Sequence, residues 1–166
     1  NGKKLELVIR DDNANPGGVR FTLDGQSVTA RPGETIWEVA QRRGTTIPHL
    51  CHRPQQPGYR PDGNCRACMV EIEGERVLAP SCRRTPAEGM VVRAASPRAE
   101  QARRMVLELL VADQPAREDS RDPHATFWDM ADATGATTSR FPANAPRPEP
   151  DRSHVAMQVA LDACIS

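Results

Sequence analysis

The stretch Gly63-Asn64-Cys65-Arg66-Ala67-Cys68, with Cys51 before it and Cys82 after it, decides how this chain is organised. These four cysteines follow the spacing C-x13-C-x2-C-x13-C. Thiolates are soft ligands that suit iron–sulfur clusters, zinc or copper(I). A C-x2-C pair brings two thiolates from one tight loop to one metal centre, and the small Gly63 and Ala67 let backbone N–H groups point at the sulfurs. We therefore expect a metal centre held by Cys51, Cys65, Cys68 and Cys82.

Three kinds of cysteine site compete for this spacing. Structural zinc sites usually show two C-x2-C or C/H pairs, whereas here one pair is flanked by two distant single cysteines. Disulfides need an oxidising compartment, and no hydrophobic leader is visible. One early cysteine, a C-x2-C pair and one distant cysteine is the plant-type [2Fe–2S] order, although the plant-type first gap is shorter. The order favours the [2Fe–2S] cluster, with zinc and disulfides as alternatives.

The histidines are weaker ligand candidates. A Rieske centre replaces two cysteines by histidines on one iron. His52 directly follows Cys51, however, and adjacent residues rarely bind the same centre. We therefore interpret His49 and His52 as solvent-facing or as neighbours of the ligands, and His124 and His154 as ordinary polar residues.

The length, charge and cysteine content of the chain limit its possible partners. At 166 residues the chain is long enough for one ordinary domain and an extension. Its 22 Lys and Arg balance 22 Asp and Glu, so no charge excess favours nucleic acid or an anionic membrane. No apolar run approaches the roughly 20 residues that span a bilayer. Five cysteines without a secretory leader predict a reducing, cytoplasmic location, and we expect neither nucleic acid nor membrane as a partner.

The first half of the chain predicts strands and one helix. Residues 5–10 are apolar enough for a short strand. Residues 19–23 and 26–30 alternate on either side of Asp24-Gly25, which is a strong hairpin signal. Thr35 and Glu38 form a capping box for a helix with Ile36, Val39 and Ala40 on one face, and Gly44 ends it. A hairpin, a helix and then a cysteine loop is the opening of a β-grasp fold.

The second half predicts a further hairpin and a long helix. Residues 69–73 and 76–79 would pair around Gly74-Glu75 and bring Cys82 back towards Cys68, and 90–93 would be the last strand. Ser96 and Pro97 begin a helix that Pro115 stops. Its amphipathic stripe, which we interpret as core packing, is Ala102, Met105, Val106, Leu109 and Leu110. A short helix beginning at Thr126 and a proline-rich segment around residues 142–150 follow.

Taken together, these features resemble a known family. The segment from Val19 to about Val111 is similar to the N-terminal [2Fe–2S] domain of NAD-dependent formate dehydrogenase alpha subunits. The same domain opens the large iron–sulfur subunit of complex I and the diaphorase part of NAD-reducing hydrogenases, and its first cysteine gap is longer than the plant-type gap. The matching stretches are residues 35–40, 63–71 and 80–82. The resemblance implies that Cys51 and Cys65 hold one iron and that Cys68 and Cys82 hold the other.

The tail refines this resemblance. Complex I subunits follow the domain with a histidine and three cysteines that bind a [4Fe–4S] cluster, but residues 125–141 contain no cysteine. Residues 153–165 are similar to the formate dehydrogenase segment that leads into a two-cluster ferredoxin module. Cys164 would be the first cysteine of that module and, with no metal to hold here, a free thiol. We therefore divide the chain into an N-terminal extension (1–18), a ferredoxin-like domain (19–95) and an extension towards a truncated ferredoxin module (96–166).

These observations predict an α+β, β-grasp [2Fe–2S] ferredoxin-like domain with a helical and irregular C-terminal extension. Its expected function is electron transfer within a multisubunit oxidoreductase, NAD-dependent formate dehydrogenase by resemblance. The parent would add [4Fe–4S] clusters, a molybdenum or tungsten pterin, FMN and NAD, and its other subunits or domains would be the partners. The chain itself shows no catalytic constellation. The alternative is a non-redox, ubiquitin-like or zinc-stabilised module that binds proteins through the helix over residues 96–112.

Overall fold

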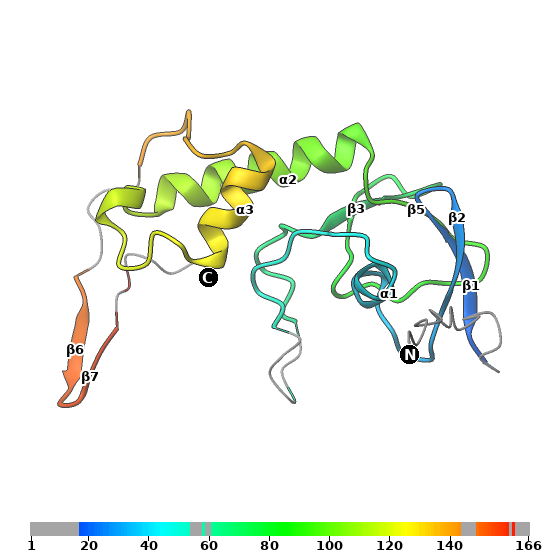
Figure 1. Cartoon of the computed structure of the whole chain (residues 1–166), viewed down its shortest axis with the longest axis horizontal. Coiled ribbons are helices and arrows are strands. Elements are labelled where there is room, and N and C mark those ends of the chain that lie inside the picture. The colour runs from blue at the N-terminus through cyan, green and yellow to red at the C-terminus, as the bar shows by residue number, and fades with distance from the viewer. Residues whose placement is uncertain (1–16, 54–57, 59–60, 144–148, 160, 162–166) are drawn as a thin grey trace, which may run out of the picture.

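The computed structural model describes residues 17–53, 58, 61–143, 149–159 and 161 (Figure 1). The strand expected at residues 5–10, residues 1–16 of the predicted N-terminal extension (1–18) and Cys164 lie outside these ranges. Within them, a mixed sheet lies at one end of the molecule and two helices cross beside it (Figure 1).

Five strands form the main sheet, in the order β2-β1-β5-β3-β4. The pairings β1–β2, β3–β4 and β3–β5 are antiparallel, whereas β1 and β5 are parallel. This mixed arrangement, with a helix following the first hairpin, confirms the predicted α+β, β-grasp class. The strands are β1 (Val19–Leu23), β2 (Gln26–Ala30), β3 (Met69–Ile72), β4 (Ala79–Pro80) and β5 (Val91–Arg93).

The first hairpin forms where the sequence predicts it. Phe21 of β1 lies opposite Val28 of β2, and both are buried because alternate residues of each strand face the core. Asp24 and Gly25 take φ angles of 48° and 81°, as the two-residue turn of a tight hairpin requires. The Asp24 carboxylate also accepts hydrogen bonds from the backbone N–H groups of Ala94 and Ala95, at 2.7 and 3.2 Å. The turn is thereby tied to the segment after β5.

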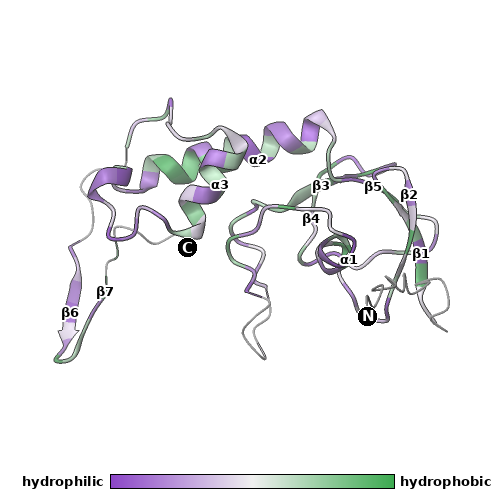
Figure 2. Ribbon diagram, in the orientation of Figure 1, coloured by the Kyte–Doolittle hydropathy of each residue, from purple (hydrophilic) through white to green (hydrophobic). Residues whose placement is uncertain are grey.

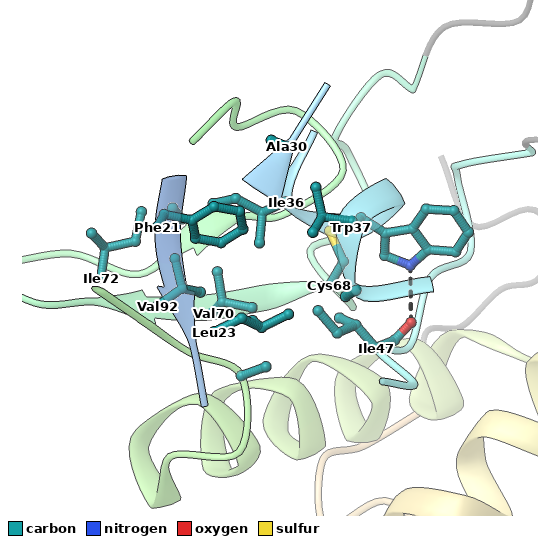
Figure 3. Packing of buried hydrophobic residues seen from close by; sticks show 14 of the residues in the cluster. Phe21, Leu23, Ala30, Ile36, Trp37, Ile47, Cys68, Val70, Ile72 and Val92 are labelled. Carbon is teal, nitrogen blue, oxygen red and sulfur yellow. Dashed lines mark hydrogen bonds between the residues drawn. The ribbon is translucent and has the colours of Figure 1, made fainter. Parts of the chain in front are cut away.

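The helix α1 (Ile36–Arg42) supplies one side of the main core. Its N-terminus carries the predicted capping box, in which Thr35 and Glu38 bond each other's backbone N–H. Ile36, Trp37, Val39 and Ala40 are buried against the sheet, and the Trp37 indole N–H donates to the carbonyl of Ile47 at 3.0 Å (Figure 3). The sheet core, as we name this cluster, is formed by Phe21, Leu23, Val28, Ala30, Ile36, Trp37, Val39, Ala40, Ile47, Cys68, Val70, Ile72, Ala79, Cys82, Val92 and Ala94.

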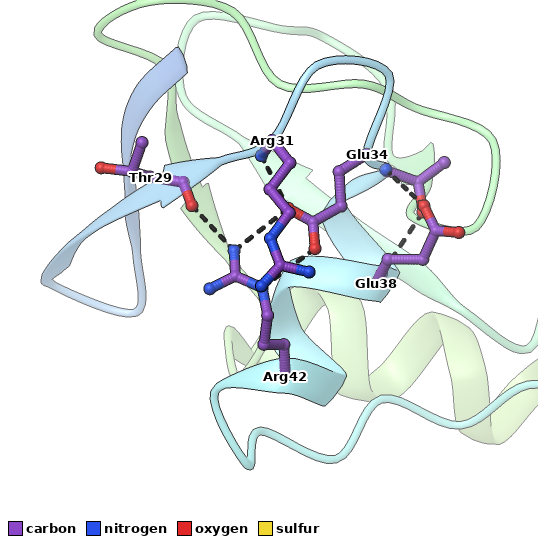
Figure 4. A network of polar contacts seen from close by, with 6 residues as sticks. Thr29, Arg31, Glu34, Glu38 and Arg42 are labelled. Atoms are coloured by element: carbon purple, nitrogen blue, oxygen red, sulfur yellow. Dashed lines mark hydrogen bonds and ion pairs between the residues drawn. The ribbon is translucent and has the colours of Figure 1, made fainter. Parts of the chain in front are cut away.

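A polar network joins the end of α1 to β2 on the outside of this core. The Arg42 guanidinium donates to the Glu34 carboxylate at 3.0 Å and to the carbonyl of Thr29 at 2.8 Å (Figure 4). Glu34 also accepts from the backbone N–H of Arg31 at 2.8 Å. One arginine thus fixes the loop between the hairpin and the helix.

The second hairpin is shorter than the prediction. Strand β3 pairs with β4 through Met69–Pro80 and Val70–Ala79, so the returning strand covers only Ala79–Pro80 rather than residues 76–79. Val77 is 62 % exposed in the wide loop between them. The chain leaves the sheet after β3 and returns only just before Cys82. Strand β4 is therefore only two residues long.

The long helix α2 (Pro97–Asp113) begins at Ser96 and Pro97 as predicted, whereas the predicted stripe is confirmed only in part. Leu110 packs against a buried cluster, but none of the five stripe residues is fully buried. The residues that face the interior are Ala99, Arg103 and Leu107, together with Ala112 near the end. Leu109 of the expected stripe is 45 % exposed. The stripe was read from apolar residues alone, and one position on the true buried face is an arginine.

The remaining extension packs partly on α2. It contains the 3-10 turn η2 (Arg117–Asp119) and the helix α3 (Thr126–Thr134), whose buried residues are Trp128 and Ala131. The hairpin of β6 (Asp151–His154) and β7 (Met157–Val159) stands apart, and its described residues are exposed and mostly hydrophilic in β6 (Figure 2). No helix in the described ranges combines the length and apolarity needed to cross a membrane.

Candidate metal centre

The four predicted cysteines come from three loops that meet beside the sheet. Cys51 follows α1, Cys65 and Cys68 precede β3, and Cys82 follows β4. Cys51 is half-buried, whereas the other three are no more than 5 % exposed. The loop before β3 turns at Gly63 and Arg66, which both have positive φ, 77° and 56°. This turning lets both cysteines of the C-x2-C pair face inwards.

Cys68 and Cys82 form the closer pair. Their Sγ atoms lie 3.3 Å apart, a hydrogen-bond separation and too long for a disulfide. The pairing of β3 with β4 produces this approach, as the sequence predicted. Ser81 strengthens it, because its backbone N–H and its hydroxyl both donate to the carbonyl of Cys68, at 3.1 and 2.8 Å.

Cys51 and Cys65 form the second pair. The backbone N–H of Cys51 donates to the Sγ of Cys65 at 3.4 Å. Burial raises the pKa of the Cys65 thiol, while backbone hydrogen bonds at Cys51, Ala67 and Leu50 act in the opposite direction. Backbone N–H groups aimed at a buried sulfur stabilise its thiolate, the form that binds metals.

The Cys68–Cys82 pair readily gives up one proton but not two. The hydrogen bond from Cys82 lowers the pKa of Cys68 to about 6, although burial opposes this. The same hydrogen bond, followed by burial, raises the pKa of Cys82. This hydrogen bond thus favours the thiolate at Cys68, which is the form that binds a metal ion.

The donor set and the spacing fit a cluster with two metal atoms. Two thiolates on one tetrahedral metal at about 2.3 Å lie roughly 3.8 Å apart, close to the Cys68–Cys82 separation. Across the described ranges, no group of three or more His, Cys, Asp or Glu side chains is arranged to hold a metal ion. The sulfurs instead approach in pairs, which suits one metal atom for each pair.

The two pairs belong to different hydrophobic clusters. Cys68 and Cys82 are part of the sheet core. Cys65 belongs to a second cluster, which we name the loop core, and Cys51 packs against it. The buried residues of the loop core are Leu50, Cys65, Ala67, Leu107 and Ala136. The extension after residue 96 thus contributes Leu107 and Ala136 to the side of the site that holds Cys51 and Cys65.

The structure separates the two interpretations given for His52. It is 6 % exposed, so it is a buried neighbour of Cys51 and not solvent-facing, with its ring against Trp37 at a centroid distance of 4.6 Å. Burial lowers the pKa of His52, and Glu38 partly offsets this, so the neutral imidazole is favoured. His49 contacts the same indole from another side at 4.5 Å. His124 and His154 are exposed, and their role as ordinary polar residues stays a prediction.

One neighbour of the site was not predicted at all. The Arg103 guanidinium donates to the carbonyl of Met69, the residue directly after Cys68, at 3.1 Å. The signal available in the sequence was its position, four residues after Ala99 and four before Leu107 on the face that is buried. The buried face of this helix was predicted from its apolar residues only, so no prediction was made for Arg103.

Comparison with known proteins agrees with this geometry. Residues 18–97, which contain all four cysteines, match the family model described as the 2Fe-2S iron-sulfur cluster binding domain. This segment is homologous to that domain. The match supports a [2Fe–2S] cluster as its cofactor, which the donor set fits. The division of the chain at residues 18, 95 and 96 stays a prediction.

Individual relatives are parts of oxidoreductases. The chain is 38 % identical over 125 residues to a subunit of the NADH-quinone oxidoreductase of Rhizobium meliloti, covering 74 % of this chain. It is 41 % identical over 97 residues, 57 % of this chain, to the HndD subunit of the NADP-reducing hydrogenase of Solidesulfovibrio fructosivorans. The matched segments make up only 14 % and 17 % of the lengths of those two proteins.

A solved structure extends the likeness beyond the sheet. A chain in the crystal structure of NAD+-reducing [NiFe]-hydrogenase in the H2-reduced state superposes with a TM-score of 0.73 at 31 % identity. The superposition covers 89 % of this chain and 62 % of that one. The extension after residue 97 therefore shares in the structural likeness and is not an unrelated addition.

Proposed function

We propose that this chain transfers electrons one at a time through a [2Fe–2S] cluster held by Cys51, Cys65, Cys68 and Cys82. The observation that carries the proposal is the grouping of four buried or half-buried thiols into two pairs, within a segment homologous to a 2Fe-2S domain. When bound, such a cluster accepts and returns single electrons at a low reduction potential.

The pairing of the sulfurs supports one iron for each pair. Cys68 and Cys82 would hold the iron on the side of the sheet core, where Ser81 fixes the carbonyl of Cys68. Cys51 and Cys65 would hold the other iron on the side of the loop core. Each pair combines a residue of the C-x2-C motif with a distant cysteine, so neither iron depends on the short loop alone.

The protein around these sulfurs excludes water and orients the ligands. The backbone N–H of Cys51 points at the Sγ of Cys65, and burial of Ala67 closes the loop between the two motif cysteines. Cys51 is the least buried of the four, so electrons would pass most directly through its side of the site. This is the face that a partner subunit would approach.

The parent assembly that we propose is a multisubunit, NAD-linked oxidoreductase, because the relatives are subunits of an NADH-quinone oxidoreductase and of an NADP-reducing hydrogenase. Within that class we propose NAD-dependent formate dehydrogenase, with [4Fe–4S] clusters, a molybdenum or tungsten pterin and FMN in other parts. The basis is the resemblance of residues 35–40, 63–71 and 80–82, and the lack of cysteines over residues 125–141. The assembly isolated through this subunit should reduce NAD with formate; reduction with H2 but not with formate contradicts the formate assignment alone.

The cluster is tested by metal analysis and electron paramagnetic resonance. The purified chain should contain two irons and two sulfides, and dithionite should produce the signal of one unpaired electron for each cluster. Cys65→Ala and Cys68→Ala should each abolish that signal, because each removes a ligand from a different iron. Cys164→Ser is the matched control, since it removes a cysteine without touching the four proposed ligands, and it should leave the signal unchanged.

Two further results separate the cluster from its alternatives. His49→Ala and His52→Ala should retain the cluster, because four thiolates complete the two tetrahedral sites. Loss of the cluster in a folded histidine variant contradicts the all-cysteine ligand set. A colourless protein that binds one zinc, whether purified with or without air, contradicts the electron-transfer function and supports a zinc-stabilised binding module.

A further inference from the structure

Arg103 lies on the buried face of α2, against the start of β3 and the segment after β5. It is only 8 % exposed, although its neighbour Arg104 is exposed to solvent. One nitrogen of its guanidinium, Nη1, donates to the carbonyl of Ala94 at 2.8 Å and to that of Met69 at 3.1 Å. Met69 directly follows Cys68, so this cation touches the backbone that carries one proposed ligand.

The positive charge of Arg103 is not neutralised by an ion pair. Among the described residues, the ion pairs of 4.0 Å or less join other arginines to carboxylates, and none includes Arg103. Burial lowers its pKa, while the negative charges of Glu100, Asp24 and Cys68 raise it. Arginine stays protonated in proteins under such conditions. The site therefore contains a lasting buried cation whose field reaches the Cys68 sulfur.

A buried cation acts differently on the two redox states of a cluster. Reduction adds one electron and no other charge, so the reduced cluster is the more negative state. A nearby positive charge in a low-dielectric interior stabilises that state more than the oxidised one. Net charge, hydrogen bonds and solvent exposure are the levers by which a protein sets the potential of such a centre.

We propose that Arg103 is a positioning residue that raises the reduction potential of the cluster, by placing a permanent positive charge against the carbonyl of Met69, the residue directly after Cys68. The inference rests on the proposed electron-transfer function and specifies which residue adjusts it. The hydrogen bonds hold the charge in place, because Ala94 after β5 and Met69 at the start of β3 are both fixed by the sheet. The helix α2 thus serves the redox centre through one side chain.

A purely structural role for Arg103 makes a different prediction. If the guanidinium only joins α2 to two carbonyls, its removal lowers stability and leaves the potential of any cluster that still binds unchanged. The reduction potential therefore separates the two roles, whereas thermal stability does not.

The test is a redox titration of the purified chain with its cluster, followed by the visible spectrum and electron paramagnetic resonance. Arg103→Gln removes the charge and keeps a side-chain N–H, and it should lower the reduced-to-oxidised ratio at a fixed ambient potential three- to tenfold. For a one-electron couple this corresponds to a fall of about 30 to 60 mV. Arg103→Lys retains the charge and should shift the ratio by less than half of that. Arg104→Gln removes an exposed charge one position away and is the matched control, with no shift expected.

A cluster-bearing Arg103→Gln protein with the wild-type potential would overturn the inference and leave the proposed function intact. If that variant does not bind a cluster, Arg103→Met takes its place, because methionine keeps an unbranched apolar stem for packing and removes the charge. Arg103→Met should have a lower potential than Arg103→Lys, and equal potentials of these two variants would overturn the inference. Absence of a cluster from the wild-type chain is a separate result that removes the proposed function itself.

Discussion

The two sides of the metal centre are built from different parts of the chain. The Cys68–Cys82 side is embedded in the sheet core, where strands, α1 and many large apolar side chains meet. The Cys51–Cys65 side is backed by the loop core, in which Leu107 of α2 and Ala136 after α3 cover the cysteine loops. A single cofactor would therefore join two packing units of unequal strength.

The difference assigns a role to the C-terminal extension. A fragment that ended after β5 would retain the sheet core and all four cysteines but would lose Leu107 and Ala136. The side with the half-buried Cys51 would then be the more open. The comparison thus predicts that the two sides respond separately when one core is weakened.

The largest effect is expected in the sheet core. Phe21→Ala should lower the free energy of unfolding by about 3–5 kcal/mol, because it leaves a cavity beneath the hairpin of β1 and β2. In a urea titration, cluster absorbance and far-ultraviolet circular dichroism should then be lost together, since the global fold is what weakens. Leu109→Ala, at a 45 % exposed position of α2, is the control and should change the free energy by less than about 0.5 kcal/mol.

A smaller and more local effect is expected in the loop core. Leu107 is fully buried, and Leu107→Ala should cost about 2–5 kcal/mol of local packing beside Cys65. Cluster absorbance should disappear at lower urea than the circular dichroism, because the side with Cys51 and Cys65 opens before the sheet unfolds. Coincident transitions in this variant would show that the two cores behave as one unit.

The smallest effect is expected when a fall in pH weakens one ion pair beside the sheet core. Burial raises the pKa of Glu34, but hydrogen bonds from Arg42 and from the backbone of Arg31 outweigh it, so the net pKa is lowered from 4.5. A carboxylate with a lowered folded-state pKa contributes stability above its unfolded pKa and loses it as the pH falls through the folded value. Wild-type stability should thus decline below about pH 4.5 more steeply than that of Glu34→Gln. Glu73→Gln, at an exposed ion pair with Arg93, is the comparison variant. If the stability of wild type and of Glu34→Gln declines equally steeply with falling pH, the prediction is wrong.

Local signals explain why much of the sheet side could be predicted. Asp24-Gly25 specifies its turn, Thr35 with Glu38 specifies the start of α1, and the alternation of residues 69–72 specifies which side chains face the core. Each of these signals acts over a few residues, so it can be read without knowing the rest of the fold. The pairing of Cys68 with Cys82 followed because one hairpin separates them.

The loop core and the helix that covers it depend on contacts between distant residues and were predicted less well. The apolar residues of α2 suggested a stripe that includes Leu109, but the observed register buries Arg103, whose long stem packs while its guanidinium finds carbonyl partners. His52 was expected either at the surface or beside the ligands, and contact with Trp37 buries it next to Cys51. The hairpin of β6 and β7 was not predicted, although Val155, Met157 and Val159 occupy alternate positions in the sequence; all three are exposed in the structure.

The parallel pairing of β1 with β5 has a consequence for the order of events during synthesis. The groups that it joins lie far apart in the chain; Asp24 and Ala94, which bond beside it, are separated by 70 positions. A growing chain cannot form this pairing until β5 has left the ribosome, and an isolated two-stranded hairpin is only marginally stable in water. Contacts of such long range also slow folding. The four cysteines of the proposed metal centre, of which the last is Cys82, are therefore synthesised before β5, the strand that completes the sheet.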